Sequence, residues 1–86
     1  MKKMSLKIIT PNKIIYNGDI RMLTVRTVSG DQGILPFHAP LVTLLGIGFL
    51  KIYLLDNKMI NYSISTGIMV VYKNIIKILT DDIEKN

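Results

Sequence analysis

The sequence predicts an all-β fold, built as a small antiparallel sandwich or barrel. Short apolar or alternating runs recur along all 86 residues, and turn-forming Asn, Asp, Gly and Pro residues separate them. No segment keeps the 3.6-residue period of an amphipathic helix. The strands expected from this pattern are residues 6–10, 13–16, 19–28, 41–45, 49–55, 58–65, 68–72 and 75–80.

Turn signals separate the strands of the first half. Pro11-Asn12 ends the first strand, and Asn17-Gly18 is typical of a two-residue hairpin turn. In residues 19–28, the alternation predicts that Leu23 and Val25 share one face of a longer strand.

Residues 41–45 form an apolar run, which predicts either a strand buried on both faces or one at a junction of two sheets. Gly46 and Gly48 are expected to interrupt the chain before residues 49–55, which alternate as a half-buried strand does. The turns expected in the second half are Asp56-Asn57, Thr66-Gly67 and Lys73-Asn74.

Residues 30–41, Gly-Asp-Gln-Gly-Ile-Leu-Pro-Phe-His-Ala-Pro-Leu, form the most distinctive segment. Gly30 and Gly33 are free to adopt backbone angles closed to other residues. Pro36 and Pro40 fix their own φ and favour extended geometry in the residues before them. We expect a rigid, ordered corner that contacts a partner.

Composition bounds the class of protein. Hydrophobic residues make up 49% of the chain, which supplies a core, and there is no Cys for a disulfide or a thiolate metal site. The longest apolar stretch, residues 39–50, is too short to span a bilayer, and no leader-like apolar region follows Lys2 and Lys3. We expect a soluble protein, or one peripheral to a membrane.

Catalysis and ligand chemistry have little support. His38 is the sole histidine, and no motif places an acid or nucleophile beside it. A hydrolase that uses His38 is a third hypothesis. The glycine pairs lack the lysine and helix of phosphate-binding loops. Acids at 81–84 form a terminal run, which is usually solvated and frayed. We therefore expect no catalytic, metal or cofactor-binding residue and no small-molecule ligand.

The charge of +5 conceals an asymmetry, because residues 1–80 hold ten Lys or Arg against three acids. Nucleic acid, anionic lipid and acidic proteins are all partners of such a surface. Phe49, Lys51 and Tyr53 share one strand face, as stacking platforms do. Arg21 and Arg26 are expected on opposite faces of one strand. Single-stranded nucleic-acid binding is thus the alternative hypothesis, although a surface-covering or protein-interface role for these residues is favoured.

The corner motif resembles the glycine-acid-x-glycine-I-x-P-x-H-A-P-L segment of the epsilon subunit of F-type ATP synthases. The resemblance continues, in order, through residues 6–11, 16–18, 64–68 and 78–81. It covers nearly the whole chain. The corner is the specific part, and the other segments support it.

The resemblance implies a β-sandwich of two antiparallel sheets with about ten strands. It implies a non-catalytic subunit of the rotor's central stalk that links the gamma subunit to the c-ring and helps to couple rotation to ATP synthesis. The protein would then be peripheral, on the cytoplasmic face of the bacterial inner membrane or the equivalent face of an organelle membrane. Nucleic acid is not a partner under this interpretation.

Residue roles follow from the resemblance at matching positions only. Asp31 occupies the acidic position that faces the c-ring's basic polar loop. The segment that lies near gamma is matched by His38, Ala39, Pro40 and Leu41, with Thr10 matching a first-strand position on the same side.

Three departures from the family pattern matter. Phe37 stands at a position that is usually glycine, and Thr66 where a second glycine is common. The C-terminal helical hairpin that inhibits ATP hydrolysis in the family has no counterpart. We therefore expect a sandwich domain over residues 1–80, an acidic tail over residues 81–86, and neither inhibition nor ATP sensing.

Overall fold

The computed structural model describes residues 2–86, which form strands joined by turns. The strands are β1 (Met4–Ile9), β2 (Ile14–Ile20), β3 (Met22–Thr27), β4 (Gly30–Ile34), β5 (Leu41–Tyr53), β6 (Met59–Ile64), β7 (Gly67–Tyr72), β8 (Ile75–Thr80) and β9 (Ile83–Lys85). The predicted all-β fold is confirmed, with nine described strands where the resemblance implied about ten. Within residues 2–86, no helix has the length and apolarity needed to cross a membrane.

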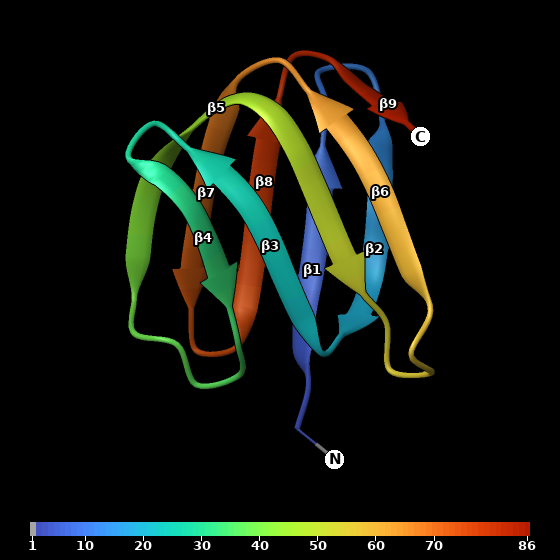
Figure 1. Cartoon of the computed structure of the whole chain (residues 1–86), viewed down its shortest axis with the longest axis vertical. Helices are drawn as coiled ribbons and strands as arrows, with labels where there is room; N and C mark the ends of the chain where they lie inside the picture. The colour runs from blue at the N-terminus through green and yellow to red at the C-terminus, as the bar shows by residue number, and fades with distance from the viewer. Residues whose placement is uncertain (1) are drawn as a thin grey trace.

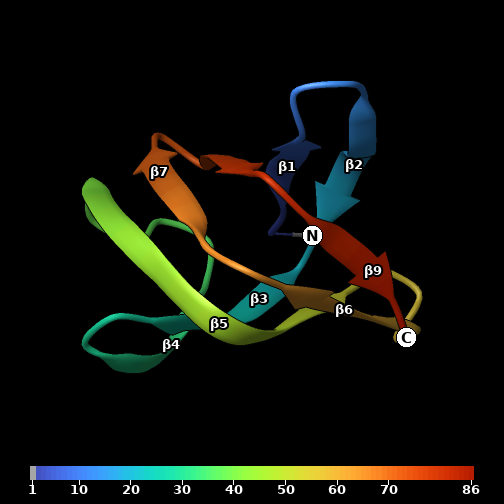
Figure 2. The same cartoon turned by 90° about the horizontal axis from the view of Figure 1, so that it is seen from above.

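The strands form one hydrogen-bonded sheet that curls into two layers (Figure 1). Figure 2 shows the layers from above, with β2, β1 and β7 in one and β4, β3, β6 and β9 in the other. The long strand β5 belongs to both, because residues 41–45 pair with β7 and residues 48–53 pair with β6. Every pairing is antiparallel except that of β1 with β8, which are far apart in sequence and need no tight turn between them.

The core lies between the two layers and is apolar. Leu23 and Val25 both point into it and are fully buried, as the alternation predicted. The buried hydrophobic residues are Met4, Leu6, Ile8, Ile20, Leu23, Val25, Ile34, Leu45, Leu50, Ile52, Tyr62, Ile64, Met69, Val71, Ile76 and Ile78. Each large side chain contributes about 1.5–3 kcal/mol on burial, so this set is the main source of stability.

The predicted hairpin turn at Asn17-Gly18 is wrong, since both residues lie within β2 and pair with β1. The chain reverses earlier, where the Thr10 N–H donates to the Lys13 carbonyl at 2.9 Å. The Lys13 N–H in turn donates to the Thr10 hydroxyl at 3.3 Å. An Asn-Gly pair favours a turn but does not require one, and the early reversal leaves it in the strand.

The strand expected over residues 19–28 is divided at Arg21, between β2 and β3. The two parts belong to different layers (Figure 2). The alternation carries no signal for this change of layer, because each part still has one buried face.

The expected interruption at Gly46 and Gly48 is also wrong, because β5 is continuous through both. Its register against β3 shifts there, so that Val25 pairs with Leu50 but Thr27 with Leu45. The glycines therefore mark the bend at which β5 passes from one layer to the other.

Residues 41–45 lie at a junction of the two layers, which was one of the two predicted possibilities. The other possibility, burial on both faces, is wrong. The Val42 and Leu44 side chains are 66% and 58% exposed, whereas Leu45 is buried.

Three turns of the second half lie close to where they were expected. Asn57, Lys73 and Asn74 all have positive φ (68°, 48° and 63°), as residues of tight hairpins often do. The Thr66-Gly67 turn leads directly into β7, which begins at Gly67. A Cβ on Gly67 would overlap the Leu79 carbonyl oxygen. Glycine is needed here because two backbones approach each other closely.

The C-terminal run is more ordered than expected. Residues 83–85 form β9, antiparallel to β6, and the Asn86 N–H donates to the Asn61 carbonyl at 2.9 Å. Ile83 packs against the core. The expectation of a frayed end is therefore wrong for these residues, since an apolar anchor and a free strand edge hold them. The division of the chain at residue 80 stays a prediction.

Candidate docking surface

The corner motif divides into a strand and a loop. Residues 30–34 form β4, an edge strand, and residues 35–40 form what we call the corner loop. Its turn is closed by the His38 N–H, which donates to the Leu35 carbonyl at 3.1 Å. Pro36 at the second position and a positive φ of 68° at Phe37 are typical of a type II turn. The predicted rigid corner therefore has a defined geometry.

The corner loop is tied to the β7–β8 turn. The Phe37 N–H donates to the Asn74 side-chain carbonyl at 2.6 Å. The His38 Nδ1 lies 2.6 Å from the Ala39 carbonyl oxygen, which holds the imidazole against its own loop. His38 is half-buried, while Ala39 and Pro40 are exposed. This arrangement leaves the backbone and small side chains of Ala39 and Pro40 open to solvent.

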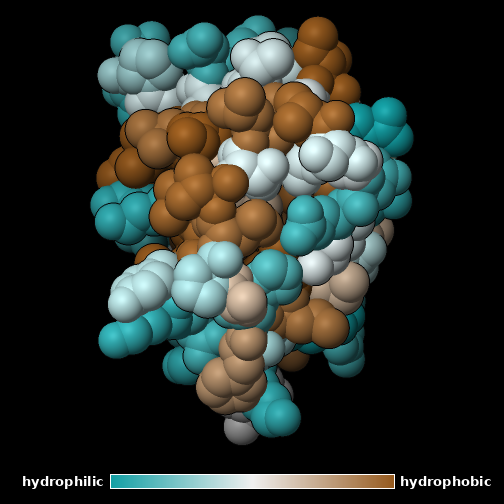
Figure 3. Space-filling view, turned by 90° about the vertical axis from the view of Figure 1, so that its left-hand side faces the viewer, coloured by the Kyte–Doolittle hydropathy of each residue, from teal (hydrophilic) through white to brown (hydrophobic). Residues whose placement is uncertain are grey.

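Apolar side chains cover most of the outward side of the first part of β5 and of β7 and β8. We call this the outer apolar face, and it consists of Val42, Leu44, Ile68, Val70, Tyr72, Ile75 and Leu79. Ile68 and Val70 are half-buried and the others are exposed, and the charged Lys77 of β8 lies among them, opposite Val70. Cross-strand pairing makes it continuous, because Val42 lies opposite Val70 and Leu44 opposite Ile68. Figure 3 shows apolar side chains gathered on the side of the molecule where the first part of β5 lies. Large exposed apolar patches of this kind mark interaction sites.

The sequence prediction missed the outer apolar face. Its signal was present in the alternation, since the first part of β5 and the strands β7 and β8 carry mostly apolar residues at both the inward and the outward positions, with Lys77 as the charged exception on β8. A strand with two apolar faces is usually predicted to be buried on both faces within a domain. Here the second face lies open on the surface.

The predicted gamma-contact residues flank the outer apolar face at its two ends. His38, Ala39 and Pro40 precede Leu41, which pairs with Val71 at one end. Thr10 follows β1 at the other end, beside the last residues of β8 (Figure 1). The structure therefore does not bring Thr10 and His38 together. It places the outer apolar face between them.

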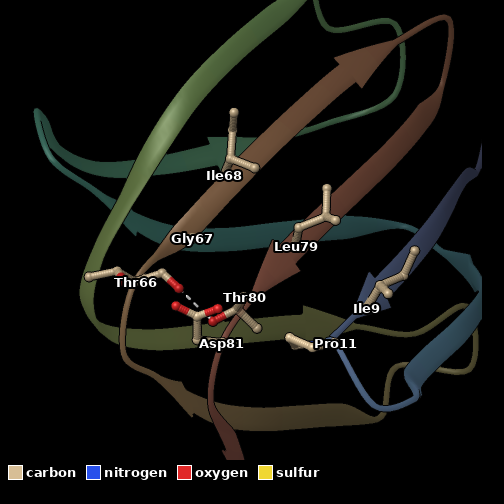
Figure 4. A pocket seen from close by; sticks show the side chains of 8 residues that line it. All are labelled: Ile9, Pro11, Thr66, Gly67, Ile68, Leu79, Thr80 and Asp81. Carbon is tan, nitrogen blue, oxygen red and sulfur yellow. Dashed lines mark hydrogen bonds between the residues drawn. The ribbon is translucent and has the colours of Figure 1, made fainter.

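A shallow cavity of ≈ 220 Å³ adjoins the Thr10 end of the face (Figure 4). The Thr80 hydroxyl donates to the Thr66 carbonyl at 2.6 Å within it. Ile68 and Leu79 belong both to its lining and to the outer apolar face. Ligand pockets are usually about 300–1,000 Å³, so the cavity is a hollow in a surface rather than a ligand pocket. No group of three or more potential metal ligands occurs among residues 2–86.

Asp31 lies on the edge strand β4, away from the corner loop. Its Oδ1 accepts from Arg26 Nε at 2.9 Å across the β3–β4 ladder. Both side chains are about half exposed, and an exposed pair of this kind contributes at most about 1 kcal/mol. Asp31 follows Gly30 at the start of β4, whereas the corner loop follows the end of that strand. The ladder pairs Thr27 with Leu45, Leu45 with Gly67 and Gly67 with Thr80, so the start of β4 lies at the same end of the sandwich as the end of β8. The carboxylate is accessible to a cation there.

Phe49, Lys51 and Tyr53 share the outward face of β5, as predicted. Arg21 and Arg26 do not point to opposite faces, which corrects the prediction. Arg21 lies over the Tyr53 ring (5.4 Å) and Arg26 over the Phe49 ring (5.7 Å). The reason is that Arg21 precedes β3 and is not bound by its alternation. These cations already contact rings, and Arg26 also contacts a carboxylate.

Two tyrosines outside the predicted site have perturbed ionisation. Burial raises the pKa of Tyr62. Burial is also the largest cause of the raised pKa of Tyr16, and the neighbouring Tyr62 and Asp19 raise it further. Tyr62 lines a cavity of ≈ 280 Å³ between β2 and β9, with Lys13 and Lys85 at its rim. Both phenols remain neutral at physiological pH and help to close the core on this side.

Comparisons with known proteins agree with the fold and with the family that the corner motif resembles. The sequence model of the ATP synthase delta/epsilon chain beta-sandwich domain matches residues 3–86. The chain is 39% identical over 83 residues to the chloroplastic ATP synthase epsilon chain of Psilotum nudum, covering 96% of this chain and 62% of that protein. It is 44% identical over 79 residues to the ATP synthase epsilon chain of Leptospira borgpetersenii, covering 92% and 61%. This chain thus spans about three fifths of the length of these relatives.

Solved structures show the same fold. A chain of the Euglena gracilis mitochondrial ATP synthase, in a structure of OSCP, F1 and the c-ring, superposes with a TM-score of 0.94 at 24% identity. The superposition covers 99% of this chain and 54% of that one. A chain from the central stalk and c-ring of the Tetrahymena thermophila enzyme gives 0.80 at 22% identity, covering 98% and 69%. On the extent of the sequence match, this chain belongs to the ATP synthase delta/epsilon family and comprises its beta-sandwich domain.

Proposed function

We propose that this chain is a non-catalytic subunit of the central stalk of an F-type ATP synthase, where it links the gamma subunit to the c-ring. It is then peripheral to the membrane, on the bacterial cytoplasmic face or the equivalent organellar face. No nucleic acid, cofactor or small molecule takes part. The observation that carries the proposal is the outer apolar face between two predicted gamma-contact segments.

A partner lying across the outer apolar face would contact His38–Leu41 at one end and Thr10 at the other. The apolar side chains of the face would be buried in the complex. Burial of apolar area contributes about 25 cal/mol per Å² to the free energy of binding, before the costs of association are subtracted. The exposed side chains of Val42 and Leu44 are the central positions. We assign the gamma contact to this face and its two ends.

The second contact, with the c-ring, is assigned to Asp31. Its carboxylate is half exposed and its Oδ1 is held by Arg26. A basic loop of the ring would face this carboxylate at the β3–β4 end of the sandwich. Because the pair is solvated, we expect the contact to guide docking more than to determine total affinity.

Family membership and the named relatives support this assignment. The relatives are ATP synthase epsilon chains, and the structures of similar fold come from assemblies with F1 or central-stalk components and a c-ring. The nucleic-acid alternative has no comparable support, because the matching family model and the named relatives are those of ATP synthase chains.

The test is co-purification of this chain with the gamma subunit encoded in the same genome. We expect a stable complex, and Leu44→Asp should weaken it at least about tenfold, since it places a charge at the centre of a buried contact. Ile14→Asp is the matched control, because Ile14 is also about half exposed (53%) but lies on β2, outside the face. Absence of binding at micromolar concentration would overturn the proposal, and equal effects of the two variants would reject the assigned face.

A further inference from the structure

Phe37 combines two features that are unfavourable in a free protein. Its φ of 68° lies in the left-handed region, which disfavours residues with a bulky side chain. Its side chain is 71% exposed. Neither feature contributes to the core, so the fold itself gives no reason for an aromatic residue at this position.

The backbone around Phe37 is held in place from several directions. The turn bond from His38 N–H to the Leu35 carbonyl (3.1 Å) closes the loop. The bond from Phe37 N–H to Asn74 Oδ1 (2.6 Å) joins it to the β7–β8 turn. Pro36 restricts the preceding φ. The aromatic ring therefore projects from a rigid support, and little ordering is needed when it binds.

The surroundings of the ring are apolar and basic. Lys2 Nζ lies 5.7 Å from the centroid of the Phe37 ring, and Lys73 Nζ lies 5.4 Å from that of Tyr72. Tyr72 belongs to the outer apolar face, which reaches this end of the sandwich. Neither residues 35–40 nor residues 72–75 contain an acid.

We propose that Phe37 is an anchor residue that inserts into an apolar pocket with an acidic rim on the gamma subunit. The ring fills the pocket, while Lys2 and Lys73 face the acidic groups around it. Rigid, exposed aromatic side chains are the residues that dominate many interfaces. This inference rests on the proposed function, because it names the chemistry of the partner surface at the corner-loop end of the same face.

The test relies on a substitution for which the proposal predicts an unchanged or higher melting temperature but a weaker affinity for gamma. Glycine adopts the left-handed region without steric cost, so Phe37→Gly should leave the melting temperature unchanged or raise it. The same change should weaken gamma binding about tenfold to thirtyfold, because it removes the anchor. A residue with a purely structural role would lower stability and binding together.

Two further substitutions separate the ring from the backbone. Phe37→Asn keeps a side chain that tolerates positive φ but lacks the ring, so it should weaken binding as Phe37→Gly does. Phe37→Tyr keeps the ring and should retain binding within about threefold. Lys73→Glu tests the acidic rim, and it should weaken binding in a manner that fades at high salt.

The outcomes distinguish this inference from the proposed function. If the unaltered chain does not bind gamma, the proposed function fails. If the unaltered chain binds and Phe37→Gly binds equally well, only the anchor is rejected. If Phe37→Gly weakens binding but Lys73→Glu does not, the acidic rim is rejected. Loss of stability in Phe37→Gly would also contradict the proposal, because the backbone strain would then be absent.

Discussion

At the scale of single residues, the space around the Cα atom differs among three glycines, and so does the need for glycine at each position. Gly67 is required because the Leu79 carbonyl occupies the space of a Cβ. Gly48 leaves room for the Arg26 side chain, whose Cδ would lie 3.1 Å from a new Cβ. At Gly33, by contrast, the nearest atom is the flexible end of Met22, at 3.4 Å. The sequence shows all three as turn signals, whereas the structure shows close packing at Gly67 and Gly48 and an ordinary contact at Gly33.

This difference gives a matched pair of substitutions. Gly67→Ala should lower the free energy of unfolding by about 1–3 kcal/mol, because backbone must move to admit the methyl group. Gly33→Ala should change it by at most about 0.5 kcal/mol. Urea titrations of both variants, followed by circular dichroism, measure the two values. Similar values for the pair would show that close approach at Gly67 is unimportant.

Asp31 gives a second prediction at this scale. Asp31→Asn should cost at most about 1 kcal/mol of stability, because its ion pair with Arg26 is about half exposed. It should weaken binding to c-rings reconstituted in liposomes, with the difference largest at low salt. Asp56→Asn is the control, since Asp56 also pairs with a cation on the surface, Lys58, but lies in the turn between β5 and β6. Unchanged ring affinity in Asp31→Asn would remove Asp31 from the docking surface.

At the scale of elements, alternation predicted most of the strands, but it placed their boundaries poorly and missed β4, whose residues were expected to form a turn. Leu23 and Val25 share the buried face as expected, because a period of two follows directly from strand geometry. The turn at Asn17-Gly18 and the interruption at Gly46 were wrong, since a turn preference yields to the register of a longer ladder. The C-terminal strand β9 escaped prediction because its pairing with β6 depends on where residues far away in sequence lie.

The strand β9 should contribute measurably to stability. Ile83→Ser should lower the free energy of unfolding by about 1–2 kcal/mol, because Ile83 packs against the core. Glu84→Gln, at an exposed position of the same strand, should have little effect. Thermal melting combined with hydrogen exchange at the β6 amides checks both variants. If Ile83→Ser leaves exchange and melting unchanged, the terminal strand is not stabilising.

At the scale of the whole molecule, the two layers of the sheet bury two tyrosines whose ionisation affects stability at high pH. Burial raises the pKa of Tyr62 and of Tyr16 above the usual value near 10. The unfolded chain then releases these protons at lower pH than the folded protein does. Stability is therefore fully present below about pH 10 and falls as the pH rises through that value.

Denaturation at pH 8 and at pH 11 measures this fall. The double variant Tyr16→Phe, Tyr62→Phe should show a smaller loss of stability between the two pH values, because neither ring can ionise. Tyr72→Phe, on the outer apolar face, is the exposed control and should keep the original loss. An identical loss in all three proteins would exclude a contribution from the buried phenols.

The class of fold, the buried faces of most strands and the corner motif follow from the amino-acid sequence alone. These depend on local properties: the period of two along a strand, the fixed φ of proline and the order of residues 30–41. The positions of Thr10 and His38 at opposite ends of one surface, with the outer apolar face between them, depend instead on how the strands pack. An apolar residue has the same pattern in sequence whether it faces a core or a partner, because the distinction depends on which strands cover it. That packing is a long-range property, and here it leaves one apolar face open.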